Sequence, residues 1–115
     1  MITAAEIMAG KLATSTRVFD VKGVGKIELH RLPATDEVKA RDVFSDKNAD
    51  PKKLEKLAQR NTYYMLHGKY DDKEAAKLPQ LMDVEQLGMI HTTGLFFTNL
   101  SQDNLEAIEK TKKAA

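Results

Sequence analysis

The stretch from 17 to 32, RVFDVKGVGKIELHRL, constrains the fold most, because it has the pattern of a β-hairpin in a chain whose other patterns are helical. Phe19 and Val21 share one face of the first arm, with polar residues on the opposite face. Ile27 and Leu29 share one face of the second arm in the same way. An isolated two-stranded hairpin is only marginally stable in water. Helices of the same chain, or strands of another copy, must therefore cover the apolar face.

The turn of this hairpin is predicted at Gly23–Gly25, where two glycines can adopt the positive φ angles of a tight reversal. A slip of the strands by one residue would separate the apolar faces, but a slip by two would not. Opposite charges favour pairing Lys22 with Glu28 and Asp20 with His30 over pairing lysine with lysine and aspartate with glutamate. Beyond that preference, the sequence leaves the register open.

The whole chain has 115 residues, which is the size of about one domain with one modest core. Its 18 Lys and Arg residues nearly balance its 17 Asp and Glu residues, so no broad field attracts nucleic acid or an anionic membrane. The sequence has no cysteine, which excludes disulfides and thiolate catalysis and fits a reducing cytoplasm. No apolar run approaches the roughly 20 residues that span a bilayer. We therefore expect a soluble, unexported protein that makes no use of a membrane.

Two helix start signals flank the hairpin. Thr3 and Glu6 have capping-box spacing, which predicts a short helix that ends near Gly10. This helix has only a thin apolar stripe, so it needs a partner to persist. After the hairpin, Thr35 is followed by two acids, which predicts an N-cap and a helix to about Phe44.

The strongest helix signal begins at Asp50-Pro51, which combines an N-cap residue with proline at the first helical position. Apolar residues then repeat with a helical period as far as His67, and Gly68 can end the helix. The charged segment 69–78 is either a loop or a short exposed helix. Pro79, directly after this segment, interrupts any continuation of a helix.

The C-terminal part carries two further start signals. Asp83 and Gln86 have capping-box spacing before a helix to about Asn99, and two glycines inside that helix indicate close packing. Ser101 is the predicted N-cap of a last helix. The chain is thus expected to be α+β, mainly helical with about four to five helices and one antiparallel hairpin near the N-terminus. We interpret it as a single domain, 1–115, with an N-terminal helix and link (1–16), the hairpin (17–32), a helical region (33–110) and a flexible tail (111–115).

The residues capable of catalysis or metal binding form no recognisable motif. His30, His67 and His91 include no HxxxH or HxH pair, and a lone histidine is typically a surface or packed residue. The turn Gly23–Lys26 leads into a strand and lacks the following Ser or Thr, so it does not match a phosphate-binding loop. No serine lies in a nucleophile motif. We therefore expect no enzyme, no cofactor and no metal.

Five aromatic and apolar residues on predicted helices are candidates for contact with a partner or with another copy. They are Tyr63, Tyr64, Leu95, Phe96 and Phe97. The alternative for each of them is a place in the core, which is the commoner role of such residues. Because a helix hides only one stripe, at least one of the adjacent pair Phe96 and Phe97 should face away from the main core contact of its helix.

Several parts of the chain follow one another in a distinctive order. The first part of the chain has a short helix (Thr3–Leu12), then a polar link (Ala13–Thr16) and then a strand (Val18–Val21). After these come a glycine-bearing turn (Gly23–Gly25), a second strand that ends in Arg-Leu (Ile27–Leu32) and a small and acidic helix start (Pro33–Glu37). A charged loop at 69–77, a helix start near Asp83 and a closing Leu100-Ser101 complete the pattern. This order resembles the tail assembly chaperones of long-tailed bacteriophages over most of the chain.

The resemblance implies a non-enzymatic protein, made in the host cell cytoplasm, that binds the tape-measure protein and helps tail-tube subunits polymerise around it. Such a protein is absent from the mature virion. In many relatives a programmed frameshift yields a longer form whose extension recruits the tail-tube protein, and Lys112-Lys113 is compatible with the slippery codons that this requires. Several copies along one long helical target would gain avidity, so we expect a homo-oligomer.

The alternative function is that of a small nucleic-acid-binding regulatory protein. The segment 51–60 contains three lysines and Arg60, and Tyr63 and Tyr64 follow it and could stack on bases. If the lysines instead solubilise the outer face of a helix, no nucleic acid is bound, and we favour this interpretation.

Overall fold

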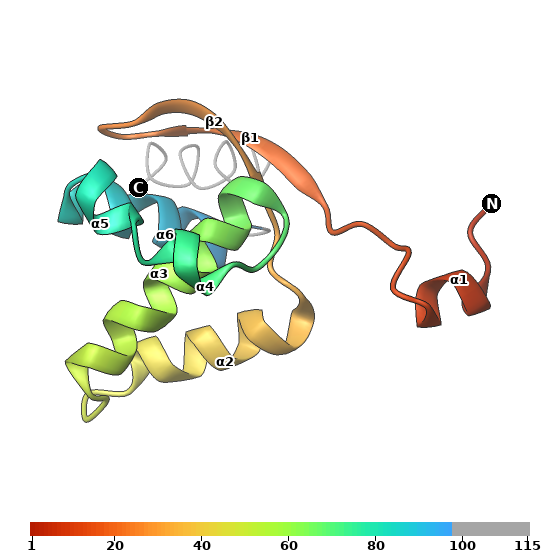
Figure 1. Ribbon diagram of the computed structural model, residues 1–115, viewed down its shortest axis with the longest axis horizontal. Coiled ribbons are helices and arrows are strands. Elements are labelled where there is room, and N and C mark those ends of the chain that lie inside the picture. Colours follow the sequence, from red (N-terminus) through yellow and green to blue (C-terminus); the bar gives the residue numbers. More distant parts are fainter. Residues whose placement is uncertain (98–115) are drawn as a thin grey trace, which may run out of the picture.

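A two-stranded antiparallel sheet lies over a group of helices in the computed structural model, which describes residues 1–97 (Figure 1). The predicted class, α+β and mainly helical with one hairpin near the N-terminus, is confirmed. The predicted last helix from Ser101, the tail 111–115 and Leu100 lie outside the described residues. Within residues 1–97, no helix is long and apolar enough to cross a membrane.

The hairpin consists of β1 (Thr16–Val21) and β2 (Gly25–His30). Its register differs from both pairings considered above, because Asp20 lies opposite Lys26 and Lys22 lies in the connecting loop. The turn geometry explains the difference. The Val24 amide donates a hydrogen bond of 2.9 Å to the Val21 carbonyl, and Gly23 supplies the positive φ of 81° that closes the turn. The loop is therefore shorter than charge pairing alone suggested, and an opposite-charge pair still results.

Helix α3 (Pro51–His67) runs through the middle of the molecule and packs against β2, α2, α4 and α6 (Figure 1). Both of its predicted ends are confirmed. The Asp50 side chain accepts a hydrogen bond of 3.0 Å from the Lys52 amide, and Gly68 ends the helix in the left-handed conformation at φ 73°. Helix α3 is therefore the central element on which the hairpin and the other helices are positioned.

Helix α2 (Ala34–Ser45) begins two residues earlier than an N-cap at Thr35 would place it. Its N-cap is Pro33, which makes no side-chain cap, so the prediction of Thr35 as the N-cap is wrong. Proline already has a fixed φ and the acids Asp36 and Glu37 interact favourably with the first turn, so the helix starts without a capping hydroxyl.

Helix α6 (Val84–Leu95) begins with the predicted capping box of Asp83 and Gln86. It ends at Leu95, so the prediction that it continues to Asn99 is wrong. Ending there lets Phe97 pack edge-on against Phe19 of β1, with ring centroids 5.3 Å apart. Tertiary packing against the hairpin therefore decides where this helix stops.

Three short helices complete the described chain. Helix α1 (Ala4–Met8) is capped by Thr3, and it lies at the far end of an extended N-terminal segment (Figure 1). The charged segment after α3 forms α4 (Asp72–Ala75), and α5 (Leu78–Leu81) follows it with a proline in its first turn. Of the two alternatives for the segment 69–78, the short helix is confirmed.

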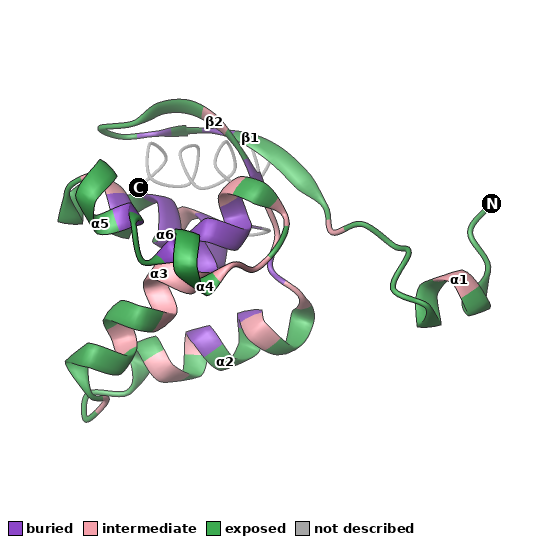
Figure 2. Ribbon diagram, viewed as in Figure 1, coloured by how far each residue is buried: buried purple, intermediate pink, exposed green. Residues whose placement is uncertain are grey.

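The core forms where α3 and α6 meet the inner face of the hairpin (Figure 2). Phe19, Val21 and Leu29 of the hairpin are buried there beside Met65 of α3 and Ile90 of α6. Helices of the same chain thus cover the apolar face of the hairpin, which makes the hairpin a scaffold.

Candidate functional site

The five residues predicted as contact candidates fall into two groups. Tyr63, Tyr64, Leu95 and Phe97 are buried within the monomer, whereas 41% of Phe96 is exposed. The expectation that one of Phe96 and Phe97 faces away from the core therefore holds. The guanidinium of Arg41 lies 5.6 Å from the centre of the Phe96 ring and partly covers it. Among the five, Phe96 is the residue whose surface a partner can reach without a rearrangement.

The buried tyrosines make contacts that hold the fold together. The Tyr64 hydroxyl lies 3.2 Å from Oγ1 of Thr14, and its ring packs on Tyr70 with centroids 4.6 Å apart. Tyr63 belongs to a second apolar cluster that contains Leu78 and Leu87. Base stacking needs an exposed aromatic face, so these two tyrosines offer no platform to nucleic acid in this conformation.

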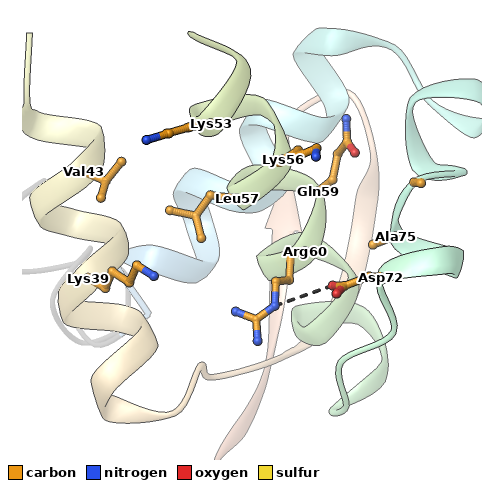
Figure 3. A pocket seen from close by; sticks show the side chains of 10 residues that line it. Lys39, Val43, Lys53, Lys56, Leu57, Gln59, Arg60, Asp72 and Ala75 are labelled. Atoms are coloured by element: carbon orange, nitrogen blue, oxygen red, sulfur yellow. Dashed lines mark ion pairs between the residues drawn. The ribbon is translucent and has the colours of Figure 1, made fainter. Parts of the chain in front are cut away.

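A groove of about 580 Å³ lies between α2, α3 and α4 (Figure 3). Basic side chains form its rim: α2 contributes Lys39, and α3 contributes Lys53, Lys56 and Arg60. Asp72 of α4 is the acidic residue of the lining, and it pairs with Arg60 at 3.6 Å. The rim of the groove is therefore strongly positive although the chain as a whole is almost neutral.

The floor of the same groove is apolar. Leu57 of α3 and Val43 of α2, both half-buried, face each other across it, and Ala75 of α4 lies along its third side (Figure 3). Ala76, which follows α4 directly, also lines the groove. Small and aliphatic side chains at these positions provide surface for another apolar group but no hydrogen-bonding partners. The groove thus has the composition of a protein-binding surface with a charged rim.

One member of the rim, Arg60, is held in place by its neighbours. Its guanidinium lies 4.0 Å from the centre of the Tyr70 ring in addition to the ion pair with Asp72. The Tyr70 hydroxyl in turn donates a hydrogen bond of 2.5 Å to Asp36 of α2. Burial and this hydrogen bond raise the pKa of Tyr70 well above its ordinary value. Tyr70 therefore fixes one end of the groove by tying it to α2.

The first thirteen residues, which we call the N-terminal arm (1–13), form a second exposed apolar surface (Figure 2). None of the α1 residues is buried, and 87% of Met8 and 45% of Ile7 are exposed. The apolar side chains of the arm are Met1, Ile2, Ile7, Met8 and Leu12. Because a helix of five residues is unstable alone, the arm needs a partner surface, as the sequence predicts.

An ionic network ties the hairpin to the helices. Glu37 is buried, and its carboxylate accepts two hydrogen bonds from Arg31, at 3.0 and 3.1 Å. Arg41 lies 3.8 Å from the same carboxylate and donates to the Leu95 carbonyl at 2.8 Å. The hydrogen bond to Glu37 raises the pKa of Arg31. This network therefore joins the end of β2, helix α2 and the last turn of α6.

Buried polar side chains lie where α3 meets α6. His91 is buried and its Nε2 lies 3.4 Å from the Asn61 amide nitrogen, while the Phe44 ring covers it at 4.7 Å. Burial lowers the pKa of His91 to about 4. Asn61 Oδ1 and Thr62 Oγ1 are buried without a hydrogen-bond partner among the described residues. These groups are packed in the core and do not reach the groove.

Residues 1–97 contain no group of three or more His, Asp or Glu side chains that could hold a metal ion. No family model, no curated protein and no solved structure matches the chain. The sequence reasoning found the basic segment of α3 and the apolar stripe of the N-terminal arm, but it missed the groove. Lys39 and Val43 are spaced one helical turn apart on α2, and that spacing is the signal that could have paired them with α3.

Proposed function

We propose that this chain is a tail assembly chaperone of long-tailed bacteriophages, which binds the tape-measure protein and promotes tail-tube polymerisation around it without entering the mature virion. The order of short helix, link, hairpin and acidic helix start in the sequence supports this proposal. The hairpin and helices of the described residues follow the same order. The sequence carries no recognisable nucleophile motif, so the role that we propose is not enzymatic.

The observation that carries the proposal is the presence of an exposed apolar arm and an open groove with an apolar floor, on a chain whose hairpin is already covered by its own helices. The N-terminal arm and the groove are both open, and they lie on different parts of the molecule. Exposed apolar surface of this kind marks contact sites for other proteins. A chaperone needs such surfaces to cover a long helical target, because they replace contacts that the target makes later with the tube.

The partners follow from this mechanism. Weak contacts repeated along one tape-measure protein gain avidity, and self-association of the chaperone through the N-terminal arm would increase it further. We therefore propose a homo-oligomer in the host cell cytoplasm. A longer form of the chain, made by a programmed frameshift, would bring the tail-tube protein to the complex, and no cofactor takes part.

Co-expression tests this function. A tagged copy of the full chain should keep a long helical protein from the same gene cluster in solution and purify with it, whereas that protein alone should aggregate. The gene order gives a cheaper check, since an overlapping reading frame and then a gene for a very long helical protein should follow. If no such gene follows and nothing helical purifies with the chain, the proposal is wrong.

The second candidate is a nucleic-acid-binding regulatory protein, which the basic rim of Lys39, Lys53 and Lys56 favours. Its weak point is the burial of Tyr63 and Tyr64, which removes the proposed stacking residues. A gel shift with mixed DNA distinguishes the two functions. Binding that weakens steeply with salt would support the regulator, because it reports phosphate contacts.

A further inference from the structure

We propose that the groove between α2, α3 and α4 binds an amphipathic α-helix of another protein, with the apolar stripe of that helix on the groove floor and its carboxylates on the basic rim. The inference rests on the proposed function only for the natural source of the helix, which would be the tape-measure protein. The chemistry of the partner is read from the groove itself.

The arrangement of the rim supports a helical partner. Lys53, Lys56, Leu57 and Arg60 have the spacing i, i+3, i+4 and i+7, so they form one stripe along α3. From Lys53 to Arg60 the stripe is about 10 Å long, given the rise of 1.5 Å per helical residue. A helix laid beside this stripe would contact it over about two turns, which is a common length for helix-in-groove recognition.

The charges on the rim specify the flanks of the partner. The ion pairs among the described residues include Arg60 but not Lys39, Lys53 or Lys56. These three lysines come from both sides of the groove (Figure 3). A helix with Asp or Glu on both edges of its apolar stripe would place carboxylates near lysines on each side at once, and complementary charge of this kind selects partner and orientation.

The rim and the floor of the groove argue against two other possible occupants, the N-terminal arm of a second copy and nucleic acid. The N-terminal arm of a second copy carries one acid, Glu6, and one base, Lys11, so it has no excess of negative charge to match the rim. Nucleic acid has the charge, but Leu57 and Val43 would face a phosphate backbone with apolar surface and no aromatic side chain lines the groove. An acidic amphipathic helix satisfies both the rim and the floor.

Fluorescence anisotropy with the full chain and three labelled peptides tests the inference. The acidic probe has about 21 residues, or three heptads, with a Leu and Ile stripe flanked by Glu. The second peptide has Lys in place of Glu, and the third has the composition of the first in scrambled order. We expect the acidic probe to bind about tenfold more tightly than either control, and its affinity to fall as salt screens the rim.

A charge-reversal variant locates the binding site. K53E/K56E should bind the acidic probe about tenfold more weakly, because two attractions become repulsions. The control K22E/K69E has the same change in net charge outside the groove and should bind like the unchanged chain. All four lysines are exposed, and a urea titration checks that both variants fold. If K53E/K56E is unfolded, K39E on the opposite side of the groove gives the same readout.

Three results would overturn the inference. The acidic probe could bind no better than its controls, both double variants could bind it equally well, or duplex DNA could bind the groove more tightly than the probe. The last result would make the rim a phosphate site. The proposed function is judged separately, because a tape-measure protein that still purifies with K53E/K56E leaves the chaperone in place and removes only this groove as its binding site.

Discussion

Replacing Gly94 by alanine should destabilise the protein, because Gly94 of α6 lies directly against Met65 of α3. An alanine Cβ at this position would overlap Met65 Sδ and come within 2.6 Å of Cε and 3.0 Å of Cγ. Met65 is completely buried, so its side chain has little room to move away. Overpacking of this kind costs about 1–3 kcal/mol, and alanine recovers up to about 1 kcal/mol through its better helix propensity.

Gly88 in the same helix provides the matched control. No atom outside its own helix lies within 4 Å of the Cβ that alanine would add there, and the residue is exposed. Gly88→Ala should therefore stabilise the protein by about 0.5–1 kcal/mol. The same substitution at two sites of one helix is thus expected to change the free energy of unfolding in opposite directions.

Urea titration followed by circular dichroism measures both changes. With a slope of about 1–3 kcal/mol per molar urea, a difference of about 2 kcal/mol between the variants separates their midpoints by roughly 1 M. Met65→Leu removes the end of the overlapping side chain and should restore part of the stability of Gly94→Ala. If Gly94→Ala is as stable as the unchanged chain, the packing of α6 on α3 described here is wrong.

Three further changes test the buried polar groups. Burial of His91 holds its pKa at about 4 in the folded chain, below the value of about 6.5 expected on unfolding. The unfolded chain therefore binds the proton first, so stability should fall by about 2 kcal/mol between pH 7 and pH 5, and His91→Gln should remove most of that loss in urea titrations at both pH values. Glu37→Gln weakens the ion pairs with two half-exposed arginines and should cost about 1 kcal/mol by the same titration, whereas an unchanged midpoint would mean that the network adds nothing. Thr62→Val removes a buried hydroxyl that has no partner among the described residues, so thermal unfolding should show equal or higher stability, and a loss above about 1 kcal/mol would reveal a hydrogen bond that was missed.

Local chemistry made some elements predictable from the sequence. Helix α3 begins at Asp50-Pro51 and ends at Gly68 as predicted, because its caps are formed by neighbouring residues. The capping box of Asp83 and Gln86 acts in the same local way at the start of α6. The alternating pattern of the hairpin likewise identified its buried face, since side chains on a strand point alternately to its two faces.

Tertiary packing decided the features that the sequence did not predict. The end of α6 depends on the contact of Phe97 with Phe19, which lies far away in the sequence. The hairpin register depends on the backbone of its turn, and cross-strand charge pairs are too weak to override that geometry. Local pattern did not predict which of the five contact candidates would be buried, because adjacent residues such as Phe96 and Phe97 differ only in what surrounds them.

The candidate site was predictable only in part, because the groove is formed by the packing of helices that are separate in the sequence. The basic segment of α3 is visible in the sequence, but whether α2 closes over it or stands apart is a property of the whole fold. The structure leaves a groove between them, with Lys39 and Val43 on the side opposite α3. A solvated helix face and the rim of a binding site therefore have the same local sequence pattern.

The most direct measurement of the central claim is co-expression of the tagged chain with the long helical protein of its own gene cluster, followed by the mass of the purified complex. The unchanged chain and K22E/K69E should both yield a soluble complex with several copies of the chain on each target. K53E/K56E should yield less complex and leave more of the target insoluble. A target that aggregates equally with and without the unchanged chain would contradict the account of this protein as a chaperone.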